Sequence, residues 1–443
     1  MAEILPFKAL RYNIDLVGDV SNVITPPYDI ISSQEQDEYY SLNLYNSIRL
    51  ELPKELPGDN NHYNKYTRAG ETLNNWLEQG VLLPEKKDCL YIYQQEFDLE
   101  DGKTLTRTGL IGLIRLEEFD KGIILPHENT LSKPKADRLN LMRACNANFS
   151  QVFGLYDDPQ AHIPSIINDY CWKHTPDILA DGGLIKTNEK LWAVDDPQFI
   201  RDVSGAFIGK QIYIADGHHR YETALAYRNE LRAKNPNHTG DELYNYVMMT
   251  IVEMEDPGLV ILPTHRMVSG IHNVGLASLM DDLKEHFHIE EHDVGTTNAN
   301  NKSYVIQNIL DDKGLHTFVL YSGKDSPLYS LSLKSLAIMS RLHPNRHSSY
   351  LDLDVSILHT LILERILGIG EKELANQENL KYTHSILEGV EEVDRGDQQM
   401  TFFMNATTIR QIQEVSLAKE KMPQKSTYFY PKLITGLVFN KFL

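Results

Sequence analysis

The chain has 443 residues, of which 42% are hydrophobic and 24% charged, and its 43 basic and 62 acidic residues give a net charge of -19. This length predicts two or three domains, and the composition is that of a globular protein. Because so acidic a surface repels phosphate backbones, sequence-independent binding of nucleic acid is not expected. The three separated cysteines, Cys89, Cys145 and Cys171, predict neither a disulfide framework nor a structural zinc site.

The N-terminal residues lack the basic and apolar regions of a signal peptide. No apolar run reaches the roughly eighteen residues that a membrane span needs. We therefore expect a cytoplasmic protein without a membrane partner, whose oligomeric state the sequence leaves open.

Helix and strand patterns alternate along the chain, which predicts a mixed α/β or α+β fold. The paired prolines of Thr25-Pro26-Pro27-Tyr28-Asp29 predict an extended, non-helical segment, and Asp29 is expected to follow it on a loop. Helices are expected over 63–79, 274–288, 355–367 and 407–421. Two more are expected to begin near Ser132, with Ser132 as the cap, and after residue 217. Strands are expected over 90–99 and 104–116 as a hairpin, and over 149–156, 211–216, 246–253, 317–321 and 399–404.

The segment Asp216-Gly217-His218-His219-Arg220 is the most informative one. It follows a short apolar strand and opens a helix, so free backbone N–H groups and the positive end of a helix dipole lie beside cationic side chains. This pattern indicates a phosphate site. The alternative is that Asp216 merely caps the helix and the histidines lie on the surface.

Two further patterns carry candidate chemistry. His127-Glu128 follows the apolar run 123–125, and a carboxylate there can accept a proton from a substrate hydroxyl; the alternative is an exposed loop acid. The basic run Lys133 to Arg143, which includes Lys135 and Arg138, could supply positive charge to phosphate oxygens; the alternative is a solvated helix face.

A metal-hydrolase interpretation also stays open. Its nitrogen and oxygen ligands would come from a set of five residues: His127, Asp216, His218, His219 and His265. Adjacent histidines on a helix point about 100° apart, so both seldom reach one ion.

Four segments together resemble a prokaryotic family known as domain of unknown function ten-fifteen. They are Pro26-Pro27-Tyr28-Asp29, Leu125-Pro126-His127-Glu128, Ala215 to Arg220, and Met422 to Lys432, and they span nearly the whole chain. The family name implies no established activity.

The segment from about Thr106 to Glu253 resembles the ParB/sulfiredoxin-like fold, in which a Gly-x-x-Arg turn belongs to the nucleotide site. Gly217 and Arg220 match that turn. His218 stands where sulfiredoxins have their catalytic cysteine, so the resemblance does not extend to sulfinic-acid reduction. ParB proteins bind CTP and DNA, but the acidity of this chain argues against a DNA clamp.

The pairing of His-Glu with Asp-Gly-His-His is similar to that of the free-serine kinases of this fold. On that resemblance, Glu128 deprotonates the serine hydroxyl, and Asp216 assists through the hydroxyl or through Mg²⁺. His218, His219 and Arg220 then bind the phosphates of ATP or ADP, together with Gly217. Further residues that this resemblance or their position makes candidates are Asp29, His127, Lys133, Lys135, Arg138, His265, Arg266 and Lys425.

The sequence thus predicts a ParB/sulfiredoxin-like core with α/β additions at both ends, divided as 1–105, 106–266 and 267–443. It predicts a Mg²⁺-dependent phosphotransferase that moves a phosphoryl group from ATP or ADP to a small hydroxylated metabolite, with free L-serine as first choice. The alternative is a ParB-like nucleotide-binding switch, or a slow NTPase without a phosphoryl acceptor.

Overall fold

The apolar runs of the first half of the chain pair into one sheet. The computed structural model of the protein describes residues 2–100, 102–130, 132–183, 186–271, 275–295, 297–370 and 379–442. Contacts divide the chain into a first unit, Met1–Pro126, Thr130–Val260 and Phe429–Leu443, and a second unit, His127–Asn129 and Ile261–Tyr428. The sheet of the first unit contains β1 (Ile4–Leu5), β4 (Leu90–Asp98), β5 (Thr104–Arg115), β6 (Ile124–Leu125), β8 (Val152–Tyr156), β9 (Ile178–Asp181), β10 (Thr187–Val194), β11 (Ile212–Asp216) and β12 (Tyr246–Glu253).

The strand order in this sheet is β6-β11-β8-β12-β5-β4-β10-β9, with β1 paired to β5. β12 is buried along its whole length, antiparallel to β5 and parallel to β8. β11 is antiparallel to β8 and parallel to β6. Parallel and antiparallel pairs within one sheet, joined by helices, make the fold mixed α/β, as predicted. The ParB/sulfiredoxin-like core stays a prediction.

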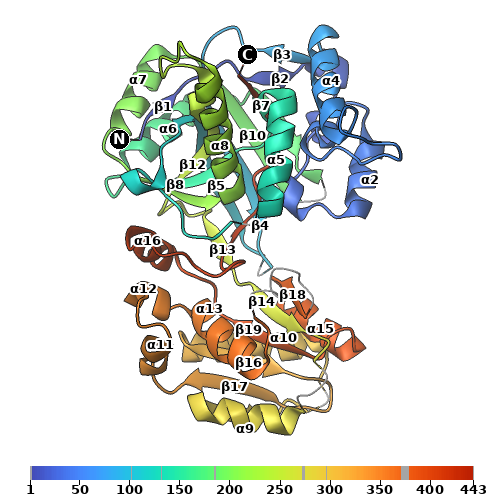
Figure 1. The fold of residues 1–443 in the computed structure, drawn as a ribbon, viewed down its shortest axis with the longest axis vertical. Helices are drawn as coiled ribbons and strands as arrows, with labels where there is room; N and C mark the ends of the chain where they lie inside the picture. The colour runs from blue at the N-terminus through green and yellow to red at the C-terminus, as the bar shows by residue number, and fades with distance from the viewer. Residues whose placement is uncertain are drawn as a thin grey trace. The chain divides into compact units, whose positions relative to one another are not determined.

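Two helices of the first unit, α5 and α8, pack side by side, and α4 packs against α5 (Figure 1). Tyr221, Ala224 and Leu225 of α8 belong to the apolar core that the sheet strands share. The helices of this unit are α1 (Ile14–Val17), α2 (Ser33–Leu42), α3 (Ile48–Glu51), α4 (Lys65–Glu78), α5 (Ser132–Cys145), α6 (His162–Lys173), α7 (Pro197–Ala206) and α8 (His218–Lys234), with 3-10 helices at Val20–Asn22, Tyr28–Ile30, Phe119–Lys121 and Leu243–Asn245.

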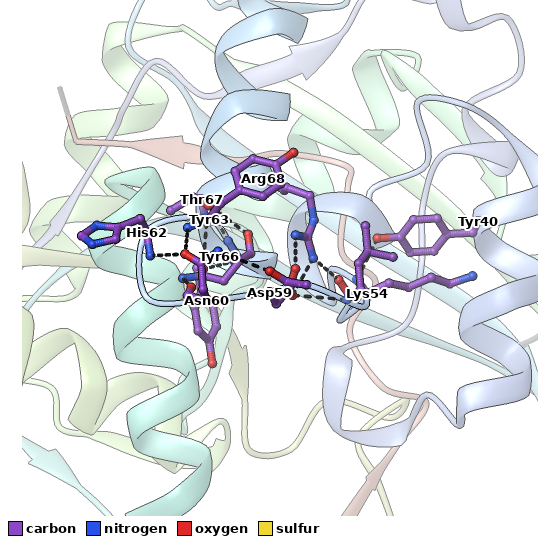
Figure 2. A network of polar contacts seen from close by, with 12 residues as sticks. Tyr40, Lys54, Asp59, Asn60, His62, Tyr63, Tyr66, Thr67 and Arg68 are labelled. Atoms are coloured by element: carbon purple, nitrogen blue, oxygen red, sulfur yellow. Dashed lines mark hydrogen bonds and ion pairs between the residues drawn. The ribbon is translucent and has the colours of Figure 1, made fainter.

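A polar network fixes the loop that precedes α4 (Figure 2). Nη2 of Arg68 on α4 donates to Oδ2 of Asp59 at 2.9 Å and to the carbonyl oxygen of Lys54 at 2.7 Å. Asn64 is the N-cap of α4 and forms a capping box with Thr67. The loop is therefore held both by a charged pair and by the helix cap.

The sheet of the second unit is antiparallel throughout its described pairs, in the order β15-β17-β16-β19-β14-β18. Its strands are β14 (His265–Val268), β15 (Phe287–His292), β16 (Thr317–Tyr321), β17 (Leu328–Leu333), β18 (Leu380–Thr383) and β19 (Met400–Met404). Its helices are α9 (Leu276–His286), α10 (Ala299–Lys313), α11 (Ala337–Leu342), α12 (Ser348–Leu351), α13 (Asp354–Ile357), α15 (Ile386–Arg395) and α16 (Ile409–Leu417), with a π-helix at Leu358–Ile366.

The remaining strands are short: β2 (Leu10–Tyr12), β3 (Leu82–Pro84), β7 (Ala147–Asn148), β13 (Val260–Leu262), β20 (Tyr428–Tyr430) and β21 (Asn440–Lys441). Of these, β2 pairs with β3, and β7 with β21.

Several predicted details differ from the structure. α5 begins at Ser132 itself, so Ser132 is not the residue before the helix that a cap requires. The helix predicted over 355–367 continues from α13 into the π-helix, in which the N–H of Leu367 donates to the carbonyl of Ile362. Residue 274, the predicted start of another helix, lies outside the described residues.

The predicted domain boundaries at 105/106 and 266/267 fall within β5 and β14. The division into three domains concerns independent folding and stays a prediction. Among the described residues, no helix is long and apolar enough to cross a membrane.

Candidate functional site

The turn between β11 and α8 lies in the first unit. β11 ends at Asp216, and Gly217 is the N-cap of α8 with φ +85°, in the left-handed region that favours glycine. The N-cap residue is thus Gly217 and not Asp216, and a glycine has no side chain that could cap α8. The alternative in which Asp216 caps this helix is therefore wrong.

The carboxylate of Asp216 instead lies between two cationic side chains. Its Oδ2 accepts a hydrogen bond of 3.0 Å from Nη2 of Arg220, and its Oδ1 lies 3.4 Å from Nζ of Lys432. Burial alone raises the pKa of Asp216, but the charges of Lys432, Arg220 and His218 outweigh it and hold this pKa below its usual range. Asp216 therefore stays ionised and fixes both cations at the N-terminus of α8.

Arg220 also contacts the residue that precedes β8. Its Nη1 donates to the carbonyl oxygen of Gln151. Gln151 is fully buried, and in the described parts of the chain neither polar atom of its side chain has a hydrogen-bond partner. Because Phe153 pairs with Asp216 in the antiparallel register, Gln151 lies at the same sheet edge as the turn. An unpartnered buried amide costs about 1–3 kcal/mol, which a polar ligand at this edge could offset.

His218 and His219 begin α8, as the sequence predicts. His218 is buried and His219 is half-buried. The first backbone N–H groups of a helix have no partner within it, and the helix dipole adds positive potential at the same place. With Arg220 and Lys432 beside them, these groups make the turn suited to an anion.

Arg138 belongs to the basic run Lys133 to Arg143, but its side chain is buried in the first unit. Its guanidinium lies 4.0 Å from the ring centre of Tyr28, and its Nη1 donates to the carbonyl oxygen of Glu51 at 2.7 Å. A cavity of about 30 Å³ has Glu51, Arg138 and Arg220 in its lining. The two buried arginines thus border a common space, which is large enough for a water molecule but too small for a nucleotide.

The other candidates of the first unit are more exposed. Lys133 is exposed, and Lys135 forms an ion pair of 2.8 Å with Glu222. Asp29 is exposed as well. Burial lowers the pKa of Arg220, but the charges of Asp216 and then Asp29 outweigh it and raise that pKa.

The predicted base, Glu128, belongs to the second unit. It is half-buried, and its Oε1 accepts a hydrogen bond of 2.9 Å from the backbone N–H of Lys425. His127 is fully buried, with its Nε2 3.1 Å from Oγ1 of Thr427, and its carbonyl accepts a hydrogen bond of 2.7 Å from the N–H of Met422. The segment from 422 to 427 therefore orients both residues of the His-Glu pair.

His265 and Arg266 are fully buried on β14, in the second unit. Arg266 donates from Nη2 to the carbonyl oxygen of Lys425 at 3.0 Å and from Nε to Nε2 of His359 at 3.2 Å. Burial lowers the pKa of Arg266 to about 10 and that of His265 to about 3. His265 is therefore neutral at pH 7, whereas a side chain that binds phosphate through its charge has to be cationic.

The Mg²⁺ site predicted at Asp216 does not fit these residues. Both oxygens of Asp216 face cations, Arg220 and Lys432, whereas Mg²⁺ binds carboxylates that are available to it. In the described ranges, no group of three or more His, Cys, Asp or Glu side chains is placed to hold a metal ion. Asp216, His218 and His219, the members of the metal-hydrolase ligand set that lie in the first unit, are thus not grouped as a metal site. Mg²⁺ more commonly arrives bound to nucleotide phosphates.

Two residues of the turn region were not predicted as site residues. Lys432 ends the segment Met422 to Lys432, whose resemblance was the one signal available, but nothing local indicates that it reaches Asp216. Gln151 is a polar residue directly before an apolar strand, a pattern too common to identify a site.

The model of the family described as "Protein of unknown function (DUF1015)" matches residues 4–356, and the chain belongs to this family. No curated protein matches the sequence.

Solved structures with distant similarity include a free serine kinase in complex with AMP, with 13% identity and a TM-score of 0.34, covering 72% of this chain and 86% of that one. A conserved hypothetical protein from Pyrococcus furiosus has 13% identity and a TM-score of 0.34, with coverages of 73% and 92%. SbnI with a C-terminal truncation, from Staphylococcus aureus, has 10% identity and a TM-score of 0.32, with coverages of 74% and 86%. Likenesses this distant assign no activity to the chain.

Proposed function

We propose that the chain binds ATP or ADP at the turn between β11 and α8 and transfers a phosphoryl group to the hydroxyl of a small metabolite, with free L-serine as the first acceptor to test. The observation that carries the proposal is the position of Asp216 between Arg220 and Lys432 at the N-terminus of α8. In a protein of net charge -19, this local gathering of cations favours an anionic ligand.

The phosphate part of the ligand would be bound in two ways. The backbone N–H groups of Gly217 to Arg220 would donate to phosphate oxygens, and the side chains of Arg220 and Lys432 would balance their charge. Asp216 would hold the two cations in place rather than bind a metal. Such preorganised charge is the main contribution that a protein makes to phosphoryl transfer.

Glu128 is proposed as the base. Its carboxylate is oriented by the N–H of Lys425, and an oriented carboxylate can accept the proton of the acceptor hydroxyl as its oxygen bonds to phosphorus. The bond from that phosphorus to the oxygen of the departing nucleotide breaks in the same reaction, so a phosphoryl group moves and the nucleotide loses one phosphate.

The test is phosphorus NMR and mass spectrometry on the purified full chain with Mg²⁺, ATP or ADP, and a pool of hydroxylated metabolites that includes L-serine. Formation of O-phosphoserine would support the proposal. Glu128→Gln should then lower turnover by about two to four decades with little change in folding, whereas Glu290→Gln, on the exposed face of β15, should leave it unchanged. Full activity of Glu128→Gln would remove this residue from the mechanism.

The switch without phosphoryl transfer is the second candidate. It needs only the residues that would bind phosphate, and these all belong to the first unit. Nucleotide that is bound or slowly hydrolysed in the same assay, without any phosphorylated acceptor, would favour the switch. Asp216→Asn should weaken nucleotide binding under either candidate.

A further inference from the structure

We propose that the C-terminal segment Phe429 to Lys432 completes the nucleotide site and that the ammonium group of Lys432 is a direct ligand of the nucleotide phosphates. This inference rests on the nucleotide binding proposed above, but not on phosphoryl transfer. It makes the charge balance proposed for Lys432 a direct contact with phosphate and explains how a residue so far in sequence from the turn at Asp216 is positioned for it.

The backbone of this segment is held at three successive carbonyl groups. Arg107 donates from Nη2 to the carbonyl oxygen of Pro431 at 2.7 Å and from Nη1 to that of Tyr430 at 3.4 Å. Gln95 donates from Nε2 to the carbonyl oxygen of Lys432 at 3.1 Å. Because these bonds fix the main chain directly at Lys432, its side chain starts from a defined position.

The residues that hold the segment are themselves fixed. Arg107 and Gln95 are both 1% exposed, and they are hydrogen-bonded to each other on neighbouring strands β5 and β4. Gln95 donates in addition to Oε1 of Glu189 at 3.2 Å, and Glu189 also accepts from the hydroxyl of Tyr93 at 2.5 Å. A buried polar network of this kind rigidifies the strands that carry it.

The same network reaches the turn through Phe153. The guanidinium of Arg107 lies 4.8 Å from the centre of the Phe153 ring, and the ring of Phe429 packs edge-on against it at 5.4 Å. Phe153 in turn pairs with Asp216 across β8 and β11. The segment Phe429 to Lys432, the clamp formed by Arg107 and Gln95, and the turn at Asp216 thus form one packed structure within the first unit.

The contact between Lys432 and Asp216 suits a shared cation. The Nζ–Oδ1 distance is 3.4 Å, whereas a strong charge-assisted hydrogen bond is about 2.7–2.9 Å long. Lys432 is only 7% exposed, so a second anion at this place gains a cation that is already largely desolvated. Arg220 already holds the other oxygen of Asp216, so the carboxylate remains compensated while Lys432 turns toward phosphate.

The test is isothermal titration of the full chain with ATP, ADP and adenosine. Lys432→Gln should weaken ATP or ADP binding by about tenfold to a hundredfold, the usual effect of losing a charge-assisted bond, and leave adenosine binding within about twofold. Lys432→Arg keeps the positive charge and should lose less affinity for ATP and ADP than Lys432→Gln. Lys210→Gln is the matched control, because Lys210 forms an ion pair of 3.1 Å with Asp158 beside the opposite end of β11.

Equal ADP affinity of Lys432→Gln and the wild type would overturn this inference but not the proposed function. An equal loss of affinity for adenosine and for ADP would also overturn it, because it indicates a structural role for Lys432. A wild type that binds none of these ligands would overturn both this inference and the proposed function. Lys432→Gln leaves the carboxylate of Asp216 with one cation fewer, and this variant can fail to fold for that reason. In that case Asp216→Asn is compared with the double variant Asp216→Asn, Lys432→Gln, because neither carries the carboxylate. The double variant should bind ADP at least about tenfold more weakly than Asp216→Asn, and equal affinities would overturn the inference.

Discussion

Arg107 donates a hydrogen bond of 2.7 Å from Nη2 to the carbonyl oxygen of Pro431, across 324 positions of the chain. Burial lowers the pKa of Arg107 to about 10, so its guanidinium is still charged at neutral pH. A charged group so deeply buried is tolerated because oxygen acceptors surround it. Arg107 therefore joins strand β5 to the C-terminal end of the first unit.

Arg107→Met should lower the free energy of unfolding by about 2–4 kcal/mol, because it leaves the carbonyl of Pro431 and the side chain of Gln95 without their donor. Urea denaturation of the full chain measures this change. Arg410→Met, on the exposed surface of α16, is the control and should alter stability by less than about 0.5 kcal/mol. Equal stabilities of the two variants would show that the clamp adds nothing to the fold.

Gly217→Ala should weaken both the fold and nucleotide binding. The residue has φ +85°, and an added Cβ would lie 2.8 Å from Nε of Arg220. Gly209→Ala is a close control, because Gly209 has φ +89° and nothing lies within 4 Å of an added Cβ. Both changes should cost about 1–2 kcal/mol of backbone strain, measured by urea denaturation.

The difference in ADP affinity between Gly217→Ala and Gly209→Ala measures the effect of crowding Arg220. Only Gly217→Ala should reduce the affinity for ADP in a titration, since only there does the new methyl group displace a proposed phosphate ligand. Equal ADP affinity of Gly217→Ala and Gly209→Ala would contradict the role given to Arg220.

The free energy of unfolding should depend on the protonation of Asp256. Burial raises the pKa of Asp256 to about 6, although hydrogen bonds from the N–H groups of Gly258 and Thr108 act in the opposite direction. Its pKa in the unfolded chain is about 3.9, so the folded protein binds this proton more tightly. The ionised carboxyl thus destabilises the fold above about pH 6, and this penalty is relieved as the pH falls from about 7 to about 4.

Asp256→Asn should remove that part of the pH dependence, up to about 2 kcal/mol between pH 4 and pH 7. Urea midpoints of the variant and the wild type over this range measure it, with the exposed Asp202→Asn as the control. Parallel pH profiles for Asp256→Asn and the wild type would contradict the raised pKa.

The loop before α4 should open when Asp59 is lost (Figure 2). Hydrogen bonds from Arg68 are the main cause of the lowered pKa of Asp59, so the pair supports the loop at neutral pH and loses this effect as the pH falls through that pKa. Asp59→Ala should raise the rate of amide hydrogen exchange over residues 54–64 at pH 7. Glu55→Ala, at an exposed position of the same loop, should not.

Local sequence patterns predicted the elements well where the signal is short-range. The hairpin of β4 and β5, the strands β11, β12 and β16, and the helix α8 are confirmed within one or two residues, because alternation, helical spacing and turn residues act over a few positions. The cap at Ser132 was wrong. The helix predicted over 355–367 is confirmed in extent, but most of it has π-helical geometry, since the ends and the pitch of a helix respond to packing that such patterns do not contain.

The sequence by itself determined the strand, the glycine turn and the helix start at Asp216 to Arg220, because the left-handed glycine and the helix N-terminus follow from neighbouring residues. Only the tertiary structure decided which charges meet there. Lys432 reaches Asp216, Gln151 lies buried at the same sheet edge, and Arg138 points inward rather than to solvent. These outcomes depend on buried contacts between segments far apart in the chain, which patterns of neighbouring residues do not contain.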